Sequence, residues 1–112
     1  MPAQDRTELA RRSYQAYESG DRAAIEELLA DDLVFYSPAD VGIDRARYFE
    51  RCWPNHEQLA AFEFKRLREV GDEVLVTYEA ERRDGSRFRN TELLGFAGDK
   101  IRTVEVYFGW SL

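Results

Sequence analysis

The sequence predicts an α+β fold in which a strongly curved antiparallel sheet forms a cone around three helices from the N-terminal half. Two observations predict it. Apolar residues recur at three- and four-residue steps as far as Trp53, and at two-residue steps from Leu59 onward, which are the periods of helices and strands. Because helices and strands are segregated along the chain, the sheet has to curl around the helices to cover the apolar faces of both.

The first third of the chain predicts a helical hairpin. No proline or glycine interrupts Asp5–Ser19, and its apolar side chains fall on one side of a helix that Gly20 ends. Asp21 is placed to cap a second helix, whose apolar stripe is expected to run to about residue 32. The shared apolar side of the two helices must lie against another part of the chain.

A short strand and a third helix are expected next. The segment Leu33–Ser37 alternates and ends at Pro38, which fits an edge strand because proline cannot donate to a ladder. After the loop SPADVG, apolar side chains recur at helical spacing from Ile43 to Trp53, which predicts about three helical turns. We expect the helix to close before Pro54 and the segment PNHE to be a connecting loop.

From Leu59 the two-residue period predicts long strands in a meander. The second of these long strands, Glu73–Arg82, is joined to the third by the loop segment RDG, residues 83–85. A two-residue Asp-Gly turn would set an apolar face opposite an arginine-rich face. A three-residue loop with Gly85 in the left-handed bulge position keeps apolar opposite apolar, and it pairs Tyr78 with Asn90 and Val76 with Glu92.

The last strand has two alternatives for its inward face. Val104, Val106 and Phe108 alternate with Glu105 and Tyr107 along it. We expect the valine face to point inward, which needs an odd-length loop around Gly98-Asp99. A tight two-residue turn would instead send Glu105 and Tyr107 inside.

The long strand that follows the RDG loop carries the strongest indication of function. Phe88, Asn90, Glu92, Leu94 and Phe96 share one face of it, because side chains alternate along a strand. This face is mostly large and apolar, yet it holds an amide and a carboxylate in its middle. An ionisable group in an apolar wall costs free energy unless it has a partner or a role. The face is therefore either part of the core, with polar groups buried in it, or the wall of a pocket.

Composition limits the classes of function. The 112 residues, 44% of them hydrophobic, fit one folded domain over 1–112, without the roughly 20-residue apolar run of a membrane span. The net charge of −6 argues against nucleic-acid and anionic-membrane partners. The N-terminal MPAQDRTELARR lacks the apolar core of a secretory signal, so a cytoplasmic location is expected. One cysteine, Cys52, excludes an internal disulfide and a cysteine-based metal cluster.

Four arginines gather around the predicted hairpin. On an acidic protein they indicate a solvated hairpin tip, with a site for a phosphate or a partner as the alternative. They are Arg82, Arg83, Arg87 and Arg89.

The chain resembles the SnoaL-like proteins of the nuclear transport factor 2-like superfamily, which are of the polyketide-cyclase and ketosteroid-isomerase type. The resemblance runs through AYESGDRAAIEELLADDLVFYSPAD, GIDRARYFERCW and LLGFAGDKIRTVEVYF. These motifs are specific for the fold and not for the reaction, since members include isomerases, cyclases, dehydratases, epoxide hydrolases, transport adaptors and domains without known activity. The resemblance implies a conical pocket lined by the concave face of the sheet, and a homodimer formed largely through the sheet.

The catalytic residues of the ketosteroid isomerases carry over at one of three positions. Their general base, an aspartate just before the proline that ends the first strand, corresponds to Ser37. Their oxyanion-hole tyrosine on the first helix corresponds to Ser13, with Tyr14 and Tyr17 nearby but rotated. Their second oxyanion donor, an acid kept protonated by an apolar site, corresponds to Glu92. The resemblance therefore does not imply steroid isomerisation.

Three residues are candidates for catalysis. Glu92, facing a cavity, would have a raised pKa and could donate a hydrogen bond or move a proton; alternatively it is a structural carboxylate satisfied by an arginine or a tyrosine. Asp40 could reach the pocket rim as a base, or it shapes its own loop. His56, the only histidine, could act at the pocket mouth or lie in solvent. No metal site and no cofactor are expected.

The expected ligand is a small, largely apolar molecule. If the protein is an enzyme, the expected chemistry is cofactor-free proton transfer on a carbonyl compound, as in an isomerase or a cyclase. Asn90 and Tyr78 would orient this ligand, unless they only bond each other, and many aromatic side chains are available to line a pocket. The alternative is a noncatalytic binding or dimerisation module whose pocket is filled by its own side chains. The candidate ligand-binding residues are Tyr14, Tyr17, Phe35, Ser37, Phe49, Trp53, Phe64, Tyr78, Asn90, Val106, Phe108 and Trp110.

Overall fold

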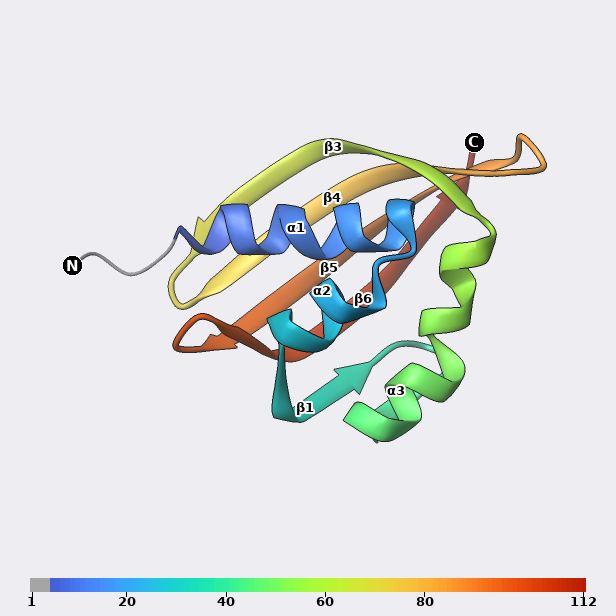
Figure 1. Cartoon of the computed structure of the whole chain (residues 1–112). Coiled ribbons are helices and arrows are strands. Elements are labelled where there is room, and N and C mark those ends of the chain that lie inside the picture. Colours follow the sequence, from blue (N-terminus) through green and yellow to red (C-terminus); the bar gives the residue numbers. More distant parts are fainter. Residues whose placement is uncertain (1–4) are drawn as a thin grey trace.

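The computed structural model describes residues 5–112, and its element order confirms the α+β prediction. The helices precede most of the strands, as the sequence periods predict (Figure 1). The helical elements are α1 (Arg6–Ser19), α2 (Arg22–Leu28), α3 (Arg45–Arg51) and the 3₁₀ helix η1 (Trp53–Glu57). The strands are β1 (Leu29–Tyr36), β2 (Val41–Asp44), β3 (Leu59–Val70), β4 (Glu73–Arg82), β5 (Arg87–Ala97) and β6 (Lys100–Ser111).

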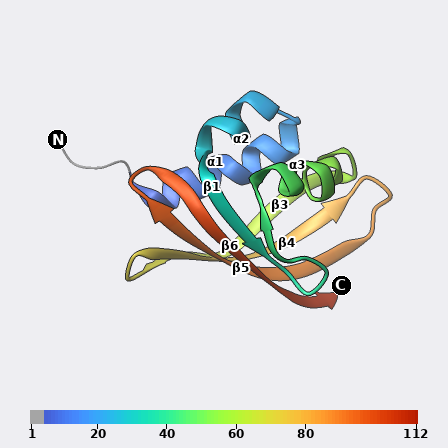
Figure 2. The same ribbon diagram turned by 90° about the horizontal axis from the view of Figure 1, so that it is seen from below.

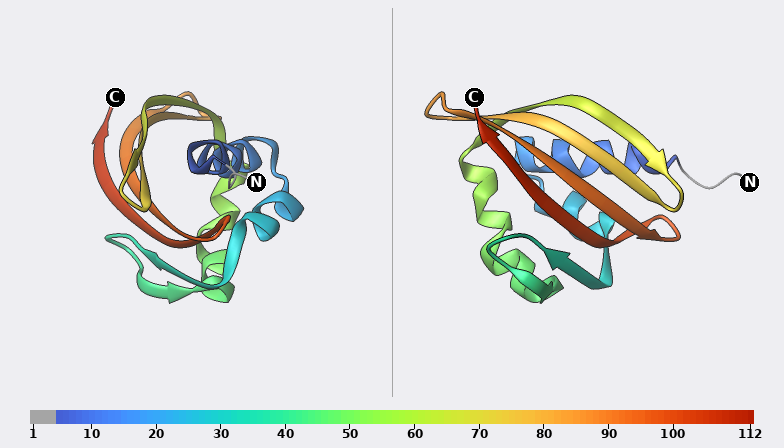
Figure 3. Two further views of the ribbon diagram at one scale, coloured as in Figure 1. Left: turned by 90° about the vertical axis from the view of Figure 1, so that its left-hand side faces the viewer. Right: turned by 180° about the vertical axis from the view of Figure 1, so that it is seen from behind.

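The strands form one six-stranded sheet in the order β2-β1-β6-β5-β4-β3. Neighbouring strands run antiparallel, except that β1 is parallel to β6. The sheet curves around α1, and the helices lie on its concave side (Figures 2 and 3). The concave face therefore provides the wall against which both a core and a cavity are built.

The first helices begin and end where their capping residues stand. The Asp5 carboxylate accepts a hydrogen bond from the Thr7 backbone N–H at 2.9 Å, and Asp21 accepts one from Ala24 at 3.1 Å. Gly20 ends α1 with φ at +68°, a left-handed conformation that glycine adopts without strain. The prediction that the second helix reaches residue 32 is wrong, because the chain becomes extended at Leu29 and joins the sheet.

The first strand is longer than predicted and is not an edge strand. It lies between β6 and β2, and β2 occupies part of the predicted loop SPADVG. The reversal depends on Ser37, whose hydroxyl accepts hydrogen bonds from the backbone N–H groups of Ala39 and Asp40 at 3.2 and 3.1 Å. Pro38 therefore sits in a tight turn that sends the chain back along β1, where its missing N–H costs nothing.

The third helix is shorter than predicted, and the segment after it is not an irregular loop. The α-helix ends at Arg51, and the chain continues as η1 with Pro54 in its first turn. Proline is tolerated there because the first N–H groups of a helical turn have no intrahelical partner. Trp53, predicted on the third helix, is buried at the start of η1, and His56 of the segment predicted as a loop lies against it.

The β4–β5 hairpin confirms the predicted register. Tyr78 lies opposite Asn90 and Val76 opposite Glu92, and Gly85 has φ at +90°. Gly85 N–H donates to the Arg82 carbonyl at 2.9 Å to close the loop. The pairing places Glu92 on the concave face, beside the fully buried Val76.

The last hairpin has the predicted inward face but not the predicted turn. Gly98 and Asp99 form a tight two-residue turn, with Ala97 opposite Lys100. Beyond it Phe96 pairs with Ile101, whereas Gly95 pairs with Thr103. The extra residue in β6 shifts the alternation by one position, so that the valine face turns inward despite the tight turn.

The core fills the space between the concave face and the helices. Its largest fully buried side chains come from α2, β1, β4 and β6, and are Ile25, Leu33, Ile101, Val74 and Val76. Within residues 5–112, no helix has the length and apolar character needed to cross a membrane.

A second irregularity in β6 generates a prediction. Phe108 pairs with Asn90 and Ser111 with Phe88, so two residues of β6 stand opposite Arg89. A Cβ added at Gly109 would meet the Arg89 carbonyl oxygen well inside van der Waals distance. We expect Gly109→Ala to lower the free energy of unfolding by about 1–3 kcal/mol, because backbone must move to admit the methyl group. Urea denaturation checks this, and a loss below about 0.5 kcal/mol would contradict the close approach.

Candidate functional site

A cavity of about 340 Å³ lies between the concave face of the sheet and the helices. Its buried part is lined by helices α1, α2 and α3 and by strands β1, β4, β5 and β6, and its exposed part includes residues of η1 and of the strand ends. Many of the residues predicted to form the site line this cavity. These are Tyr14, Tyr17, Phe35, Ser37, Asp40, Tyr78, Asn90, Glu92, Val106 and Phe108.

Glu92 is the central polar group of the cavity. The Tyr14 hydroxyl donates to its Oε1 at 2.9 Å, and the Tyr78 hydroxyl donates to its Oε2 at 2.7 Å. Neither oxygen is in an ion pair with the described residues, and the nearby Val76 and Leu94 are buried and apolar. Both interpretations from the sequence are thus partly realised: the carboxyl group faces a cavity, and tyrosines satisfy it.

The position of Tyr14 differs from the expectation that it would be rotated away. It is buried on α1, and its ring contacts Phe62, Phe64 and Tyr78 at centroid distances of 5.3, 5.5 and 5.3 Å. Ser13, the position expected from the ketosteroid isomerases, also lines the cavity, but its hydroxyl donates to the Ala10 carbonyl at 2.6 Å. The hydroxyl that reaches Glu92 from α1 is therefore that of Tyr14.

Desolvation raises the pKa of Glu92 above its ordinary value of 4.5. The hydrogen bonds from Tyr78 and Tyr14 act in the opposite direction, because they stabilise the charged carboxylate, and they offset burial only in part. Glu92 is half-buried because one side of it opens on the cavity. A carboxyl group of this kind keeps its proton at higher pH than an exposed glutamate and can give it to a bound molecule.

A second hydroxyl pair lies in the same cavity. The hydroxyls of Tyr17 and Tyr48 share a hydrogen bond, and burial raises the pKa of both phenols. Cys52 lines the wall beside them, and burial, followed by the charge of Asp40, raises the pKa of its thiol to about 12. The thiol is therefore protonated at neutral pH and is a poor nucleophile.

The other polar residues of the site are tied to their neighbours. Asn90 donates from Nδ2 to the Tyr78 hydroxyl at 3.4 Å and accepts from the Gly109 N–H at 3.3 Å. Asp40 forms a hydrogen-bonded ion pair with Arg51, which also lines the cavity. Asp40 thus has a cation beside it, in contrast to Glu92.

Several residues predicted for the site do not line the cavity. His56 stacks on Trp53 with centroids 4.4 Å apart, and Trp53 packs edge-on against Tyr17 at 4.9 Å. Trp110 is 62% exposed because the irregular pairing of β6 turns it outward, where Arg89 lies 5.3 Å from its ring centroid. The residues outside the lining are His56, Phe49, Trp53, Phe64 and Trp110.

Tyr48, Arg51 and Arg82 are among the lining residues that were not predicted. Tyr48 precedes the Phe49 of the expected apolar stripe, and its spacing of four from Cys52 places both on one side of α3. Helical spacing does not place Arg51 in the lining, because its position depends on an ion pair with Asp40, which lies in the turn between β1 and β2. Arg82 follows Tyr78 and Ala80 at two-residue steps, so strand alternation alone would have placed it on the concave face.

Comparisons with known proteins agree with this architecture. A family model described as SnoaL-like domain matches residues 10–104, which confirms the resemblance predicted from the sequence. None of the curated proteins matches the chain.

Among residues 5–112 there is no group of three or more His, Cys, Asp or Glu side chains arranged to hold a metal ion.

Solved structures share the fold at low sequence identity. A cystatin-fold protein from Novosphingobium aromaticivorans is 20% identical with a TM-score of 0.75, covering 93% of this chain and 98% of that one. A protein assigned as a polyketide cyclase from Sinorhizobium meliloti is 19% identical with a TM-score of 0.75, covering 89% and 94%. An LEH-like epoxide hydrolase from M. tuberculosis is 16% identical with a TM-score of 0.77, covering 96% and 84%.

The raised pKa of Glu92 predicts how stability depends on pH. Because the folded state holds this proton more tightly than the unfolded state, stability falls as pH rises from about 4.5 through the raised pKa. The change is absent in Glu92→Gln, which cannot ionise. We therefore expect the free energy of unfolding of the wild type, relative to Glu92→Gln, to decrease over this range and then level off. Urea denaturation at a series of pH values checks it, and a relative stability that rises with pH would show the carboxylate to be the favoured form.

Proposed function

Because this chain belongs to the SnoaL-like domain family, we propose that it binds a small, largely apolar carbonyl compound in the cavity and transfers a proton on it without a cofactor. The observation that carries the proposal is a carboxyl group with a raised pKa, held by two phenols inside an apolar cavity. A cavity of about 340 Å³ is of the size that small-molecule sites have.

In the proposed reaction Glu92 is the proton donor. Its protonated carboxyl group donates to the carbonyl oxygen of the ligand, which makes the hydrogen on the adjacent carbon more acidic. A carboxylate then removes that hydrogen as a proton, the electron pair of the C–H bond forms the C=C bond, and the carbonyl oxygen takes the Glu92 proton to give the enol. Asp40 is the proposed base because it lines the same cavity and is paired with Arg51. His56 is a weaker candidate, since its ring lies on Trp53 outside the lining.

Two further observations support ligand binding over a module with a filled pocket. Trp53, Phe64 and Trp110 do not line the cavity, so these large side chains do not fill it. The structural relatives include an epoxide hydrolase and a protein assigned as a polyketide cyclase, so this fold supports chemistry on small organic molecules elsewhere.

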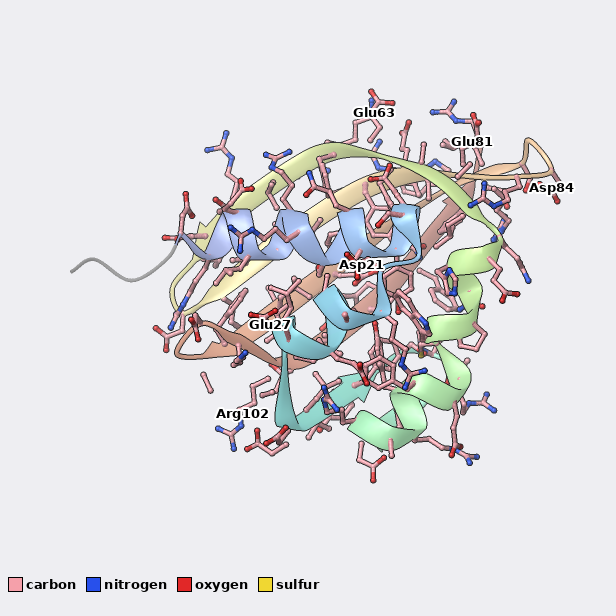
Figure 4. The ribbon with its side chains drawn as sticks, viewed as in Figure 1. Asp21, Glu27, Glu63, Glu81, Asp84 and Arg102 are labelled. Atoms are coloured by element: carbon pink, nitrogen blue, oxygen red, sulfur yellow. The ribbon has the colours of Figure 1, made fainter. Side chains whose placement is uncertain are left out.

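Hydrogen exchange on a bound ketone tests the catalytic role of Glu92. With 2-tetralone in D₂O, we expect the protein to accelerate deuterium incorporation at the carbon next to the carbonyl group, followed by NMR. Glu92→Gln should lower this rate by about 10²-fold or more, because the amide N–H is far too weak an acid to transfer a proton. The matched control is Glu81→Gln, which removes a carboxylate of β4 on the outer side of the sheet (Figure 4).

The pH dependence of the same rate distinguishes the two roles of a carboxyl group. As a proton donor Glu92 must be protonated, so the rate should fall as pH rises through its raised pKa. A rate that rises with pH would make Glu92 the base, and a rate unchanged in Glu92→Gln would remove it from the reaction.

We further propose that the chain acts in the cytoplasm as a homodimer formed through the convex face of the sheet. Tyr107 is 54% exposed and pairs with Thr91 on that face. Sedimentation equilibrium should give twice the 13.1 kDa mass of the chain. Tyr107→Glu is expected to shift the mass toward the monomer by placing a charge in the interface, and a monomeric wild type would contradict the proposal.

A further inference from the structure

The exposed end of the cavity is built from the β4–β5 hairpin and η1. The Arg83 backbone N–H donates to the Gln58 carbonyl and its Nε to the Glu57 carbonyl, each at 2.8 Å. These bonds hold η1 against the start of the hairpin, so that exposed polar and aromatic groups meet at the cavity mouth. The lining residues there are Asn55, Gln58, Arg82, Phe88 and Phe108.

Arg82 is the cation of this mouth. It is the last residue of β4, on the concave face and half-buried. Its guanidinium lies 4.3 Å from the ring centroid of Phe88, and its Nη1 donates to the Ser86 hydroxyl at 3.3 Å. Stacking on an aromatic ring fixes the plane of the guanidinium and leaves N–H donors free along its edge.

The neighbouring arginines are satisfied by the protein, whereas Arg82 has no carboxylate partner among residues 5–112. Arg87 and Arg89 pair with Glu79 on the outer side of the sheet at 3.4 and 3.2 Å. Arg51, the other cation that lines the cavity, pairs with Asp40. The charge of Arg82 is therefore available to a molecule entering the cavity.

Asp84, the carboxylate of the hairpin turn, is hydrogen-bonded to Ser86. Asp84 accepts from the Ser86 backbone N–H at 2.9 Å and from the Ser86 hydroxyl at 2.6 Å. It lies at the hairpin tip, outside the cavity lining (Figure 4). The arginine-rich hairpin is thus divided: Arg87 and Arg89 belong to the outer surface, and Arg82 belongs to the cavity.

We propose that the ligand is an organic carboxylate, whose charged end pairs with Arg82 at the mouth and whose apolar body extends toward Glu92. A guanidinium offers two parallel N–H donors that match the two oxygens of a carboxylate. Phe88 and Phe108 flank the entrance with apolar surface for the body of the ligand. This inference rests on the proposed function, since it concerns what binds in the same cavity.

The negative net charge of the chain makes a comparison of anionic and neutral ligands a sensitive test for a local cation. At −6 the protein as a whole repels anions, so a preference for an anion over a neutral molecule of the same shape requires a local cation. The probes are 1-naphthylacetate and its uncharged analogue 1-naphthylacetamide, with binding followed by isothermal titration calorimetry at low salt. We expect the wild type to bind the carboxylate about tenfold more tightly than the amide.

Substitution of Arg82 should remove this preference. Arg82→Gln is expected to weaken binding of the carboxylate about tenfold and to leave binding of the amide unchanged. Arg68→Gln, an exposed change on β3, alters the net charge equally and should affect neither probe. The wild type itself gives an independent measurement should Arg82→Gln fail to fold: raised salt should weaken binding of the carboxylate and not of the amide.

The possible outcomes separate this inference from the proposed function. If both probes bind equally and without dependence on salt, Arg82 does not select a carboxylate, while the cavity remains a ligand site. If the carboxylate is preferred and Arg82→Gln keeps the preference, the assignment to Arg82 is wrong. If neither probe binds the wild type, the inference fails together with ligand binding.

Discussion

The candidate site depends on one half-buried carboxyl group, that of Glu92, whose only polar partners among the described residues are tyrosine hydroxyls. Burial of Glu92 favours its protonated form, and the hydrogen bonds from Tyr14 and Tyr78 favour its charged form. Burial has the larger effect because no cation compensates for the lost hydration. Asp40 shows the contrast in the same cavity, where Arg51 neutralises its charge. The site therefore holds two carboxyl groups in different surroundings, one bonded only to tyrosine hydroxyls and one paired with an arginine.

The position of that carboxyl group is set by backbone features far from it. Gly85 supplies the left-handed residue that keeps β4 and β5 in register, and this register turns Glu92 toward the helices. The extra residue of β6 near Arg102 then brings Val106 to the same side, opposite Glu92. A shift of one residue in either hairpin would exchange an inner face for an outer one. The register of the two hairpins thus determines which side chains face the cavity.

Much of this could be predicted from the sequence, because it follows from alternation and spacing. The α+β class, the register of the β4–β5 hairpin and the inward position of Glu92 follow from apolar periodicity and one glycine. The strand β2 could not be predicted, since it pairs only after Ser37 closes a turn through its side chain. Trp110 points outward because of an irregularity in pairing that periodicity does not reveal. Arg82 was interpreted with its neighbours as a charged tip, although strand alternation places it inside.

The proton of Glu92 is accessible to direct measurement. Titration of its side-chain carboxyl carbon by ¹³C NMR should give a pKa above 4.5, and the pKa should rise further in a Tyr14→Phe, Tyr78→Phe double variant, because both hydroxyls stabilise the charged form. A pKa at or below 4.5 in the wild type would contradict the account, since Glu92 would then be an ordinary carboxylate with no proton to give.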